Sequence, residues 1–144
     1  AIAESLGIGF QDADDLHPAA NRAKMAAGQA LTDEDRWPWL SAVGFALAAQ
    51  PTLVMACSAL RRSYRDHLRQ IAGNDLRFLH LTAPAEVIAA RLVNRKGHFM
   101  PPALLASQLA TLEPLGADEG VTIDVSGAPD TALKMALSAL RQGP

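Results

Sequence analysis

The apolar run at residues 53–57, Leu-Val-Met-Ala-Cys, constrains the fold of this chain more than any other stretch. Pro51 precedes it and Ser58 follows it. A continuous apolar run with such boundaries is typical of a central strand in a parallel sheet, which other elements cover on both faces. We therefore expect this strand to be buried and the chain to have an α/β fold.

Short strands and helical segments alternate along the rest of the chain. The pattern predicts strands at residues 8–11, 76–81 and 121–125, and helices at residues 1–6, 19–27, 58–71, 84–94, 102–112 and 129–142. Such alternation indicates a parallel sheet with right-handed crossovers. A length of 144 residues fits one domain, which we expect to span residues 1–144.

One further helix has two conflicting start signals. Thr32 followed by three acidic residues is the pattern of a helix N-terminus, because carboxylates complement the positive end of the helix dipole. Pro38, however, fits best in a first helical turn. We expect the regular helix to begin at Trp37 or Pro38 and to end near residue 49.

Composition excludes several classes of protein. A hydrophobic content of 49% with 19% charged residues is ordinary for a soluble globular domain, and a net charge of −2 provides no general basic field for nucleic acid or an anionic membrane. Cys57 is the single cysteine, so no internal disulfide forms, and we interpret it as a small core residue rather than a nucleophile. No membrane span or signal peptide is visible, and we expect a cytoplasmic protein without nucleic-acid or membrane partners.

Residues 11–40 concentrate side chains that a core does not need. Asp12 and Asp14 stand two apart after a predicted strand, and alternation in an extended backbone would put both carboxylates on one side. They could share a magnesium ion, its waters or a substrate hydroxyl, and one of them could accept a proton. The alternative is a solvated acidic turn that caps a helix.

Several motifs follow one another in an order that resembles the gluconokinase family over nearly the whole chain. They are D-A-D-D-L-H-P with N-R-A-K-M-A-A-G-Q-A-L-T-D-E-D-R-W-P-W-L, then C-S-A-L-R-R-S-Y-R-D-H-L-R, then R-K-G-H-F. Ala13 stands where the family often has Gly, and Arg61 and Arg62 replace a commoner lysine. The family begins with a strand and a Gly-rich loop ending in Gly-Lys-Ser, and no G-x-x-x-x-G-K-[ST] occurs in these residues.

The resemblance implies a P-loop kinase fold, a parallel sheet in a three-layer α/β/α arrangement, with the first strand and the Walker A loop absent from this chain. It also implies ATP-dependent phosphorylation of D-gluconate with Mg²⁺, with gluconate and ATP as partners and a homodimer as one option for assembly. Because the missing loop cradles phosphates, we expect these residues alone to show no kinase activity. Because the missing strand would leave sheet edges unpaired, we also expect low stability or a tendency to associate. The alternatives are a kinase resembling shikimate kinase and a non-catalytic fragment that binds sugar acids.

The resemblance also implies roles for individual residues. Asp14 would orient and deprotonate the accepting hydroxyl, and Asp12 would hold Mg²⁺ through water. The residues expected to bind gluconate, within a substrate segment at residues 12–40 and on the helix after residue 58, are His17, Lys24, Arg36 and Arg65. The residues expected to meet the ATP phosphates, beside a lid at about residues 95–102, are Arg91, Arg95 and Lys96.

Plainer interpretations stay open for three of these sites. Arg36 could be a surface ion-pair partner of Asp33 or Asp35. Lys24 could be a solvated surface charge, and the basic residues that start at Arg91 could be an ordinary charged helix C-terminus.

Overall fold

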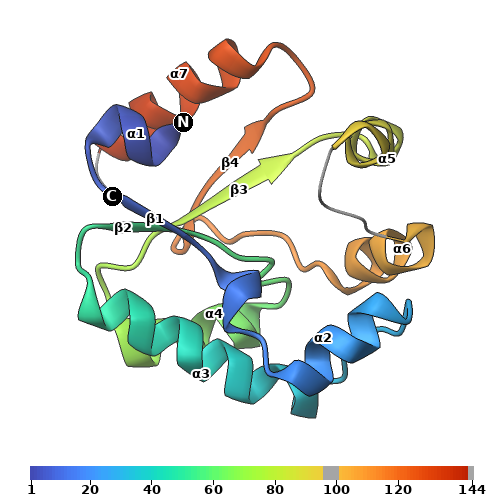
Figure 1. Ribbon diagram of the computed structural model, residues 1–144. Coiled ribbons are helices and arrows are strands. Elements are labelled where there is room, and N and C mark those ends of the chain that lie inside the picture. Colours follow the sequence, from blue (N-terminus) through green and yellow to red (C-terminus); the bar gives the residue numbers. More distant parts are fainter. Residues whose placement is uncertain (96–100, 143–144) are drawn as a thin grey trace. The chain divides into compact units, whose positions relative to one another are not determined.

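The computed structural model describes residues 1–95 and 101–142 (Figure 1). The chain divides into two compact units, one of Ala3–Leu76 with Pro101–Glu113, and one of Ala1–Ile2, Arg77–Met100 and Pro114–Pro144. The single domain over residues 1–144 stays a prediction. Within the described ranges, no helix combines the length and the apolar character that a membrane crossing requires.

The first unit is built on two parallel strands. β1 (Gly9–Asp12) pairs with β2 (Leu53–Ala56), with Gly9 opposite Leu53 and Asp12 opposite Ala56. The carboxyl ends of the two strands therefore lie together. The helix before them, α1 (Ile2–Leu6), ends at Gly7, whose φ of +67° is the left-handed conformation that a glycine stop requires.

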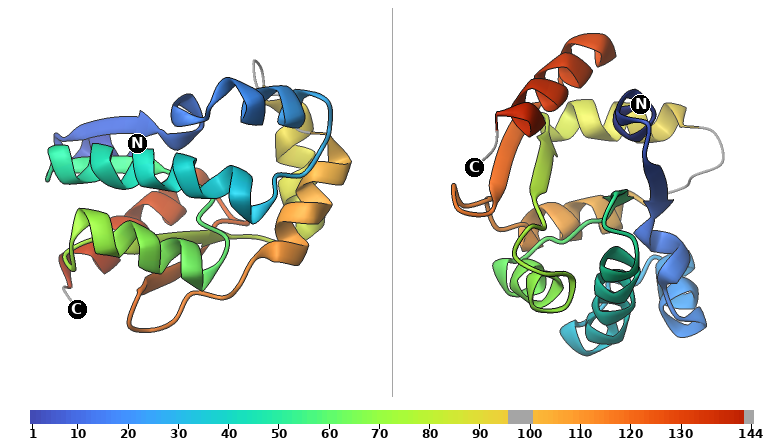
Figure 2. Two further views of the ribbon diagram at one scale, coloured as in Figure 1. Left: turned by 90° about the horizontal axis from the view of Figure 1, so that it is seen from below. Right: turned by 90° about the vertical axis from the view of Figure 1, so that its left-hand side faces the viewer.

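Four helices and a 3₁₀ turn complete this unit: η1 (Ala13–Leu16), α2 (Ala19–Ala26), α3 (Asp33–Ala49), α4 (Arg62–Ala72) and α6 (Pro102–Thr111). α3 packs along α4, as Figure 2 shows. The buried side chains of these two helices include Trp39, Leu40, Val43, Tyr64 and Leu68. A Cβ at Gly44 would lie 2.9 Å from Cβ of Ile71, so the glycine lets the two helices approach closely.

The predicted start of α3 at Trp37 or Pro38 is wrong, because the helix begins at Asp33. Oγ1 of Thr32 accepts a hydrogen bond from the Asp35 N–H at 3.2 Å, and Oδ2 of Asp35 accepts one from the Thr32 N–H at 2.9 Å. This capping box satisfies two donors of the first turn. It therefore fixes the helix start, and Pro38 is accommodated inside the helix.

Two expectations near β2 are also wrong. The strand is half-buried, with Ala56 exposed, because among the described residues β1 is the one strand that pairs with it. The helix that we expected from Ser58 begins at Arg62. Ala59 has a φ of +34°, which interrupts any regular helix at that point.

The second unit is also a parallel strand pair. β3 (Phe78–Thr82) pairs with β4 (Gly120–Asp124), with Phe78 opposite Gly120. A Cβ at Gly120 would lie 1.8 Å from the carbonyl oxygen of Phe78, so this position needs glycine. α5 (Ala85–Asn94) follows β3, and α7 (Pro129–Arg141) packs on β4. The predicted parallel α/β fold is thus confirmed in both units.

Candidate functional site

The two aspartates after β1 lie on a tight turn rather than on an extended strand. Oδ1 of Asp12 accepts a hydrogen bond from the Asp14 N–H at 3.0 Å, and Asp12 thereby caps η1. The prediction of an extended backbone from Asp12 to Asp14 is wrong, because this cap turns the chain. The side chain of Asp14 is about half exposed, at 51%. We call residues 12–17 the acidic turn.

His17 closes the acidic turn as a buried, uncharged imidazole. Its ring stacks on that of Trp39, with centroids 4.1 Å apart, and its Nδ1 receives a hydrogen bond from Nδ2 of Asn21 at 3.2 Å. Burial, followed by the positive charges of Arg22 and Arg36, lowers the pKa of His17 to about 4. Since Nδ1 accepts, the proton of the neutral ring is on Nε2, which lies 3.8 Å from Oδ1 of Asp14.

Helix α3 holds the acidic turn directly. Nε1 of Trp39 donates a hydrogen bond to the carbonyl oxygen of Ala13 at 2.7 Å, and both groups are buried. Arg36 precedes Trp39 by three residues and so lies on the same side of the helix. One helix therefore supports both the acidic turn and the arginine predicted to bind substrate.

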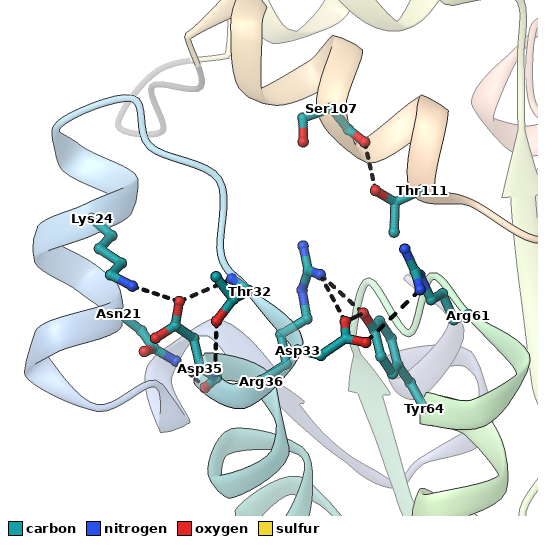
Figure 3. Close-up of polar contacts among 10 residues, drawn as sticks. All are labelled: Asn21, Lys24, Thr32, Asp33, Asp35, Arg36, Arg61, Tyr64, Ser107 and Thr111. Carbon is teal, nitrogen blue, oxygen red and sulfur yellow. Dashed lines mark hydrogen bonds and ion pairs between the residues drawn. The ribbon is translucent and has the colours of Figure 1, made fainter.

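Arg36 belongs to a cluster of four side chains, which we call the Asp33 cluster: Asp33, Arg36, Arg61 and Tyr64 (Figure 3). Nη1 of Arg36 donates to the hydroxyl of Tyr64 at 2.9 Å and lies 3.6 Å from Oδ1 of Asp33. The Tyr64 hydroxyl donates to the same Asp33 oxygen. Nη1 of Arg61 lies 3.8 Å from Oδ2 of Asp33. Burial, then the hydrogen bond to Asp33, raises the pKa of Tyr64, so its hydroxyl stays protonated.

Lys24 pairs with Asp35, the acidic residue of the capping box at the start of α3. Its Nζ lies 2.7 Å from Oδ2 of Asp35. This hydrogen bond, followed by those from Thr32, lowers the pKa of Asp35 to about 2. Nδ2 of Asn21 donates to the backbone oxygen of Asp35 at 2.8 Å and so also ties α2 to the start of α3. The structure thus gives Lys24 a role in positioning, and its contact with substrate stays a prediction.

Arg65 is buried and bonded to the backbone. Its Nη1 donates to the carbonyl oxygens of Ala59, Leu60 and Glu113, at 3.0, 3.2 and 3.3 Å. The N–H of Glu113 in turn donates to the oxygen of Leu60 at 2.8 Å. Arg65 therefore anchors the segment after β2, and the prediction that it binds gluconate is untested.

Two of the residues predicted to contact ATP, Arg91 and Arg95, lie in the second unit. Nη1 of Arg91 donates to the oxygen of Val125 at 2.5 Å, and its Nη2 donates to the oxygens of Ser126 and Gly127 at 3.2 and 3.3 Å. Arg95 is exposed and forms the C-cap of α5. Lys96 lies outside the described residues, as do residues 97–100 of the predicted lid.

The residues of the acidic turn fit one way of binding a magnesium ion, in which the protein supplies only some of the ligands. In the described part of the chain, no three His, Cys, Asp or Glu side chains converge as an all-protein metal site. Mg²⁺ is commonly held by one or two carboxylates together with waters and substrate phosphates. Asp12 and Asp14, joined through the Asp14 N–H, offer that type of donor set.

Cys57 follows β2 and is near the acidic turn. Burial, together with the negative charges of Asp14 and Asp12, raises the pKa of its thiol to about 12. A thiol with so high a pKa is protonated at neutral pH and is a poor nucleophile. This supports its interpretation as a packing residue.

Sequence reasoning missed several partners of the predicted site residues. Tyr64 and Arg61 meet Arg36 and Asp33 across nearly thirty residues, and no local pattern marks such a contact. Asn21 could have been found, because it stands four residues after His17 at the start of a predicted helix.

Comparisons with known proteins agree with the motifs. No family model matches the chain. The chain is 50% identical over 141 residues to a gluconokinase from Gluconobacter oxydans (strain 621H), a match that covers 92% of this chain and 77% of that protein. A crystal structure of a gluconokinase from Sinorhizobium meliloti 1021 matches with a TM-score of 0.90 and 46% identity, over 98% of this chain and 81% of that one. A sugar kinase structure from Janibacter sp. HTCC2649 matches with a TM-score of 0.90 and 45% identity, over 97% and 83%.

Proposed function

Because this chain belongs to the gluconokinase family, we propose that it phosphorylates D-gluconate with ATP and releases 6-phospho-D-gluconate and ADP. The observation that carries the proposal is that helix α3 supports both the acidic turn and Arg36. α3 bonds the acidic turn through Trp39 and presents Arg36 one helical turn away. One helix thus supports the turn with the carboxylate that accepts a proton and carries the guanidinium that binds an acid.

The acidic turn performs the proton transfer. The terminal hydroxyl of gluconate gives its proton to the Asp14 carboxylate as the hydroxyl oxygen bonds to the γ-phosphorus of ATP. The bond from that phosphorus to the β,γ-bridging oxygen breaks, and ADP leaves with its electron pair. Asp14 is half exposed, so a substrate hydroxyl can reach it, and Nε2 of His17 lies 3.8 Å from its Oδ1.

Arg36 binds the carboxylate of gluconate. Its guanidinium is largely buried, with 12% of the side chain exposed, and Tyr64 fixes its orientation. A planar guanidinium can form two parallel hydrogen bonds to a carboxylate. Lys24 and Arg65 have partners inside the protein, so we place them behind Arg36 as supporting residues, with His17 acting through Asp14.

ATP and magnesium complete the proposed reaction. Asp12 would hold Mg²⁺ through water, and Arg91, Arg95 and Lys96 would meet the ATP phosphates. Magnesium, when bound, neutralises charge on the transferring phosphates. We also propose a cytoplasmic location and keep a homodimer as an open prediction.

The test measures binding and turnover separately. Calorimetry on this chain, with gluconate, shikimate and the neutral polyol D-sorbitol, should show the tightest binding for gluconate and weak binding for D-sorbitol. A coupled ADP-release assay should then show gluconate-dependent turnover in a version that carries a Gly-x-x-x-x-Gly-Lys-Ser segment ahead of Ala1. A preference for shikimate would favour the related kinase, and binding without turnover in the extended version would favour a non-catalytic module.

A further inference from the structure

We propose that Arg61 is a second residue that binds the substrate carboxylate, beside Arg36, an inference that rests on the proposed function. Figure 3 shows the guanidinium groups of Arg36 and Arg61 on either side of the Asp33 carboxylate. Each of the two Asp33 oxygens faces a different arginine, at 3.6 Å for Arg36 and 3.8 Å for Arg61. Arg36, near the start of α3, and Arg61, at the start of α4, therefore both lie beside the Asp33 carboxylate.

Asp33 does not use all the hydrogen-bonding capacity of these arginines. Direct hydrogen bonds between a guanidinium and a carboxylate are about 2.7–2.9 Å long, and a guanidinium carries about five N–H donors. Both Asp33 pairs are longer than that. Arg61 is also 42% exposed, so a ligand in solution can reach its donors.

The charge of the Asp33 cluster favours an anion as its ligand. Two guanidiniums and one carboxylate leave one uncompensated positive charge, and Tyr64 is neutral. Among the neighbouring charges, Lys24 pairs with Asp35 and Arg62 pairs with Asp66, while the Glu113 carboxylate accepts a hydrogen bond from the Arg62 N–H at 2.8 Å. A hydroxy acid with one carboxylate would neutralise the cluster, whereas a neutral polyol would not.

The position of Arg61 in the fold agrees with this role. It is the N-cap residue of α4, in extended conformation, and it follows the carboxyl end of β2 by a short loop. Ligands of open parallel sheets bind outside the carboxyl ends of the strands. Arg61 is an arginine, whose planar fork can pair with both oxygens of a carboxylate, as the ammonium of a lysine cannot.

Substitutions of Arg61 test the proposal in the catalytically active version that carries the Gly-x-x-x-x-Gly-Lys-Ser segment. We expect Arg61→Lys to raise the KM for gluconate about tenfold, and Arg61→Ala about thirtyfold, while kcat and the KM for ATP change less than about twofold. Arg62→Lys is the matched control, because Arg62 is the next residue and pairs with Asp66 outside the cluster, at 3.4 Å. It should keep the parent KM. Competitive inhibition by D-sorbitol should be equal in all variants, since sorbitol has no carboxylate.

An unchanged gluconate KM in both Arg61 variants, alongside a raised KM in Arg36→Lys, would overturn the proposal for Arg61 alone. A parent protein that neither binds nor phosphorylates gluconate would instead overturn the proposed function. A raised KM for gluconate together with an equally weakened inhibition by sorbitol would also count against Arg61, because it would indicate a general distortion of the site. Thermal melts of the variants check folding, which an exposed ion pair should affect little.

Discussion

The acidic turn, which is bonded to α3, and the Asp33 cluster, which joins the starts of α3 and α4, are held together in different ways. The turn is fixed by the backbone N–H of Asp14, by the indole N–H of Trp39 and by the stacked ring of His17. The cluster is held by side chains alone, and its ion pairs are long and partly exposed. A rigid turn suits chemistry that needs a fixed carboxylate, whereas loosely paired arginines can exchange partners with a ligand. Substitutions in the turn should therefore change kcat, and substitutions in the cluster should change the KM for gluconate.

The largest effect is expected in the acidic turn. In a catalytically active version, Asp14→Asn should lower kcat about 10²–10⁴-fold, because the amide cannot accept the hydroxyl proton. The KM values for ATP and gluconate should change little. Asp15→Asn is the control, since Asp15 is the exposed neighbour whose backbone oxygen, not its side chain, receives a hydrogen bond from Arg22. If Asp14→Asn keeps more than half of the parent kcat, the acidic turn does not take part in the proton transfer.

The next largest effect distinguishes Arg65, which is bonded to backbone oxygens, from the arginines of the Asp33 cluster, which can exchange partners with a ligand. Arg65→Met keeps much of the buried volume but removes the donor to three carbonyl oxygens, of which that of Leu60 still accepts the Glu113 N–H, so we expect a loss of about 3 kcal/mol in the free energy of unfolding. Arg62→Met, at an exposed ion pair, should cost less than about 0.5 kcal/mol. Urea denaturation measures both. If Arg65→Met is fully stable but fails to bind gluconate, Arg65 belongs functionally with the Asp33 cluster.

A smaller effect tests the cluster itself. Arg36→Lys should raise the KM for gluconate about tenfold with kcat nearly unchanged, because a point cation cannot replace the paired hydrogen bonds of the guanidinium. Initial-rate kinetics over a range of gluconate concentrations measure it. If the Lys, Ala and Gln variants all keep the parent KM, Arg36 is a surface charge at a helix start and the substrate carboxylate binds elsewhere.

The sequence predicted the elements better than it predicted the contacts between them. In the described part of the chain, local signals located every strand to within two residues and the glycine stop at Gly7. The starts of α3 and α4 were missed where two local signals competed, as at Pro38, or where a strained residue, Ala59, carries no signal of its own.

For the site, motifs singled out Asp14 and Arg36 but not what positions them. Trp39 bonds Ala13 across 26 residues, and Tyr64 bonds Arg36 across 28. Such contacts depend on how α3 packs against the rest of its unit. Spacing along the chain therefore could not reveal them, although it could reveal the residue types that chemistry requires.

The smallest expected effect concerns the rigidity of the acidic turn and appears as a dependence of stability on pH. The pKa of His17 is about 4 in the folded protein, compared with 6.5 for an ordinary histidine. Between these two values the unfolded chain binds a proton that the folded chain does not, so the free energy of unfolding should fall as the pH is lowered from about 6.5 to about 4. Asp35 has a pKa of about 2, so its own contribution to the free energy of unfolding is lost only at lower pH and does not affect the range in which His17 titrates.

His17→Gln removes this titration, so its urea midpoint should fall less than that of the parent between pH 7 and pH 5. His67→Gln is the matched control for the loss of a histidine ring, because it removes a histidine from α4 but leaves His17 in place. Equal slopes in the parent and in His17→Gln would mean that the ring takes up a proton in the folded state as readily as in the unfolded one. The acidic turn would then be as adaptable as the Asp33 cluster, and the division between a rigid catalytic region and an exchangeable binding region would fail.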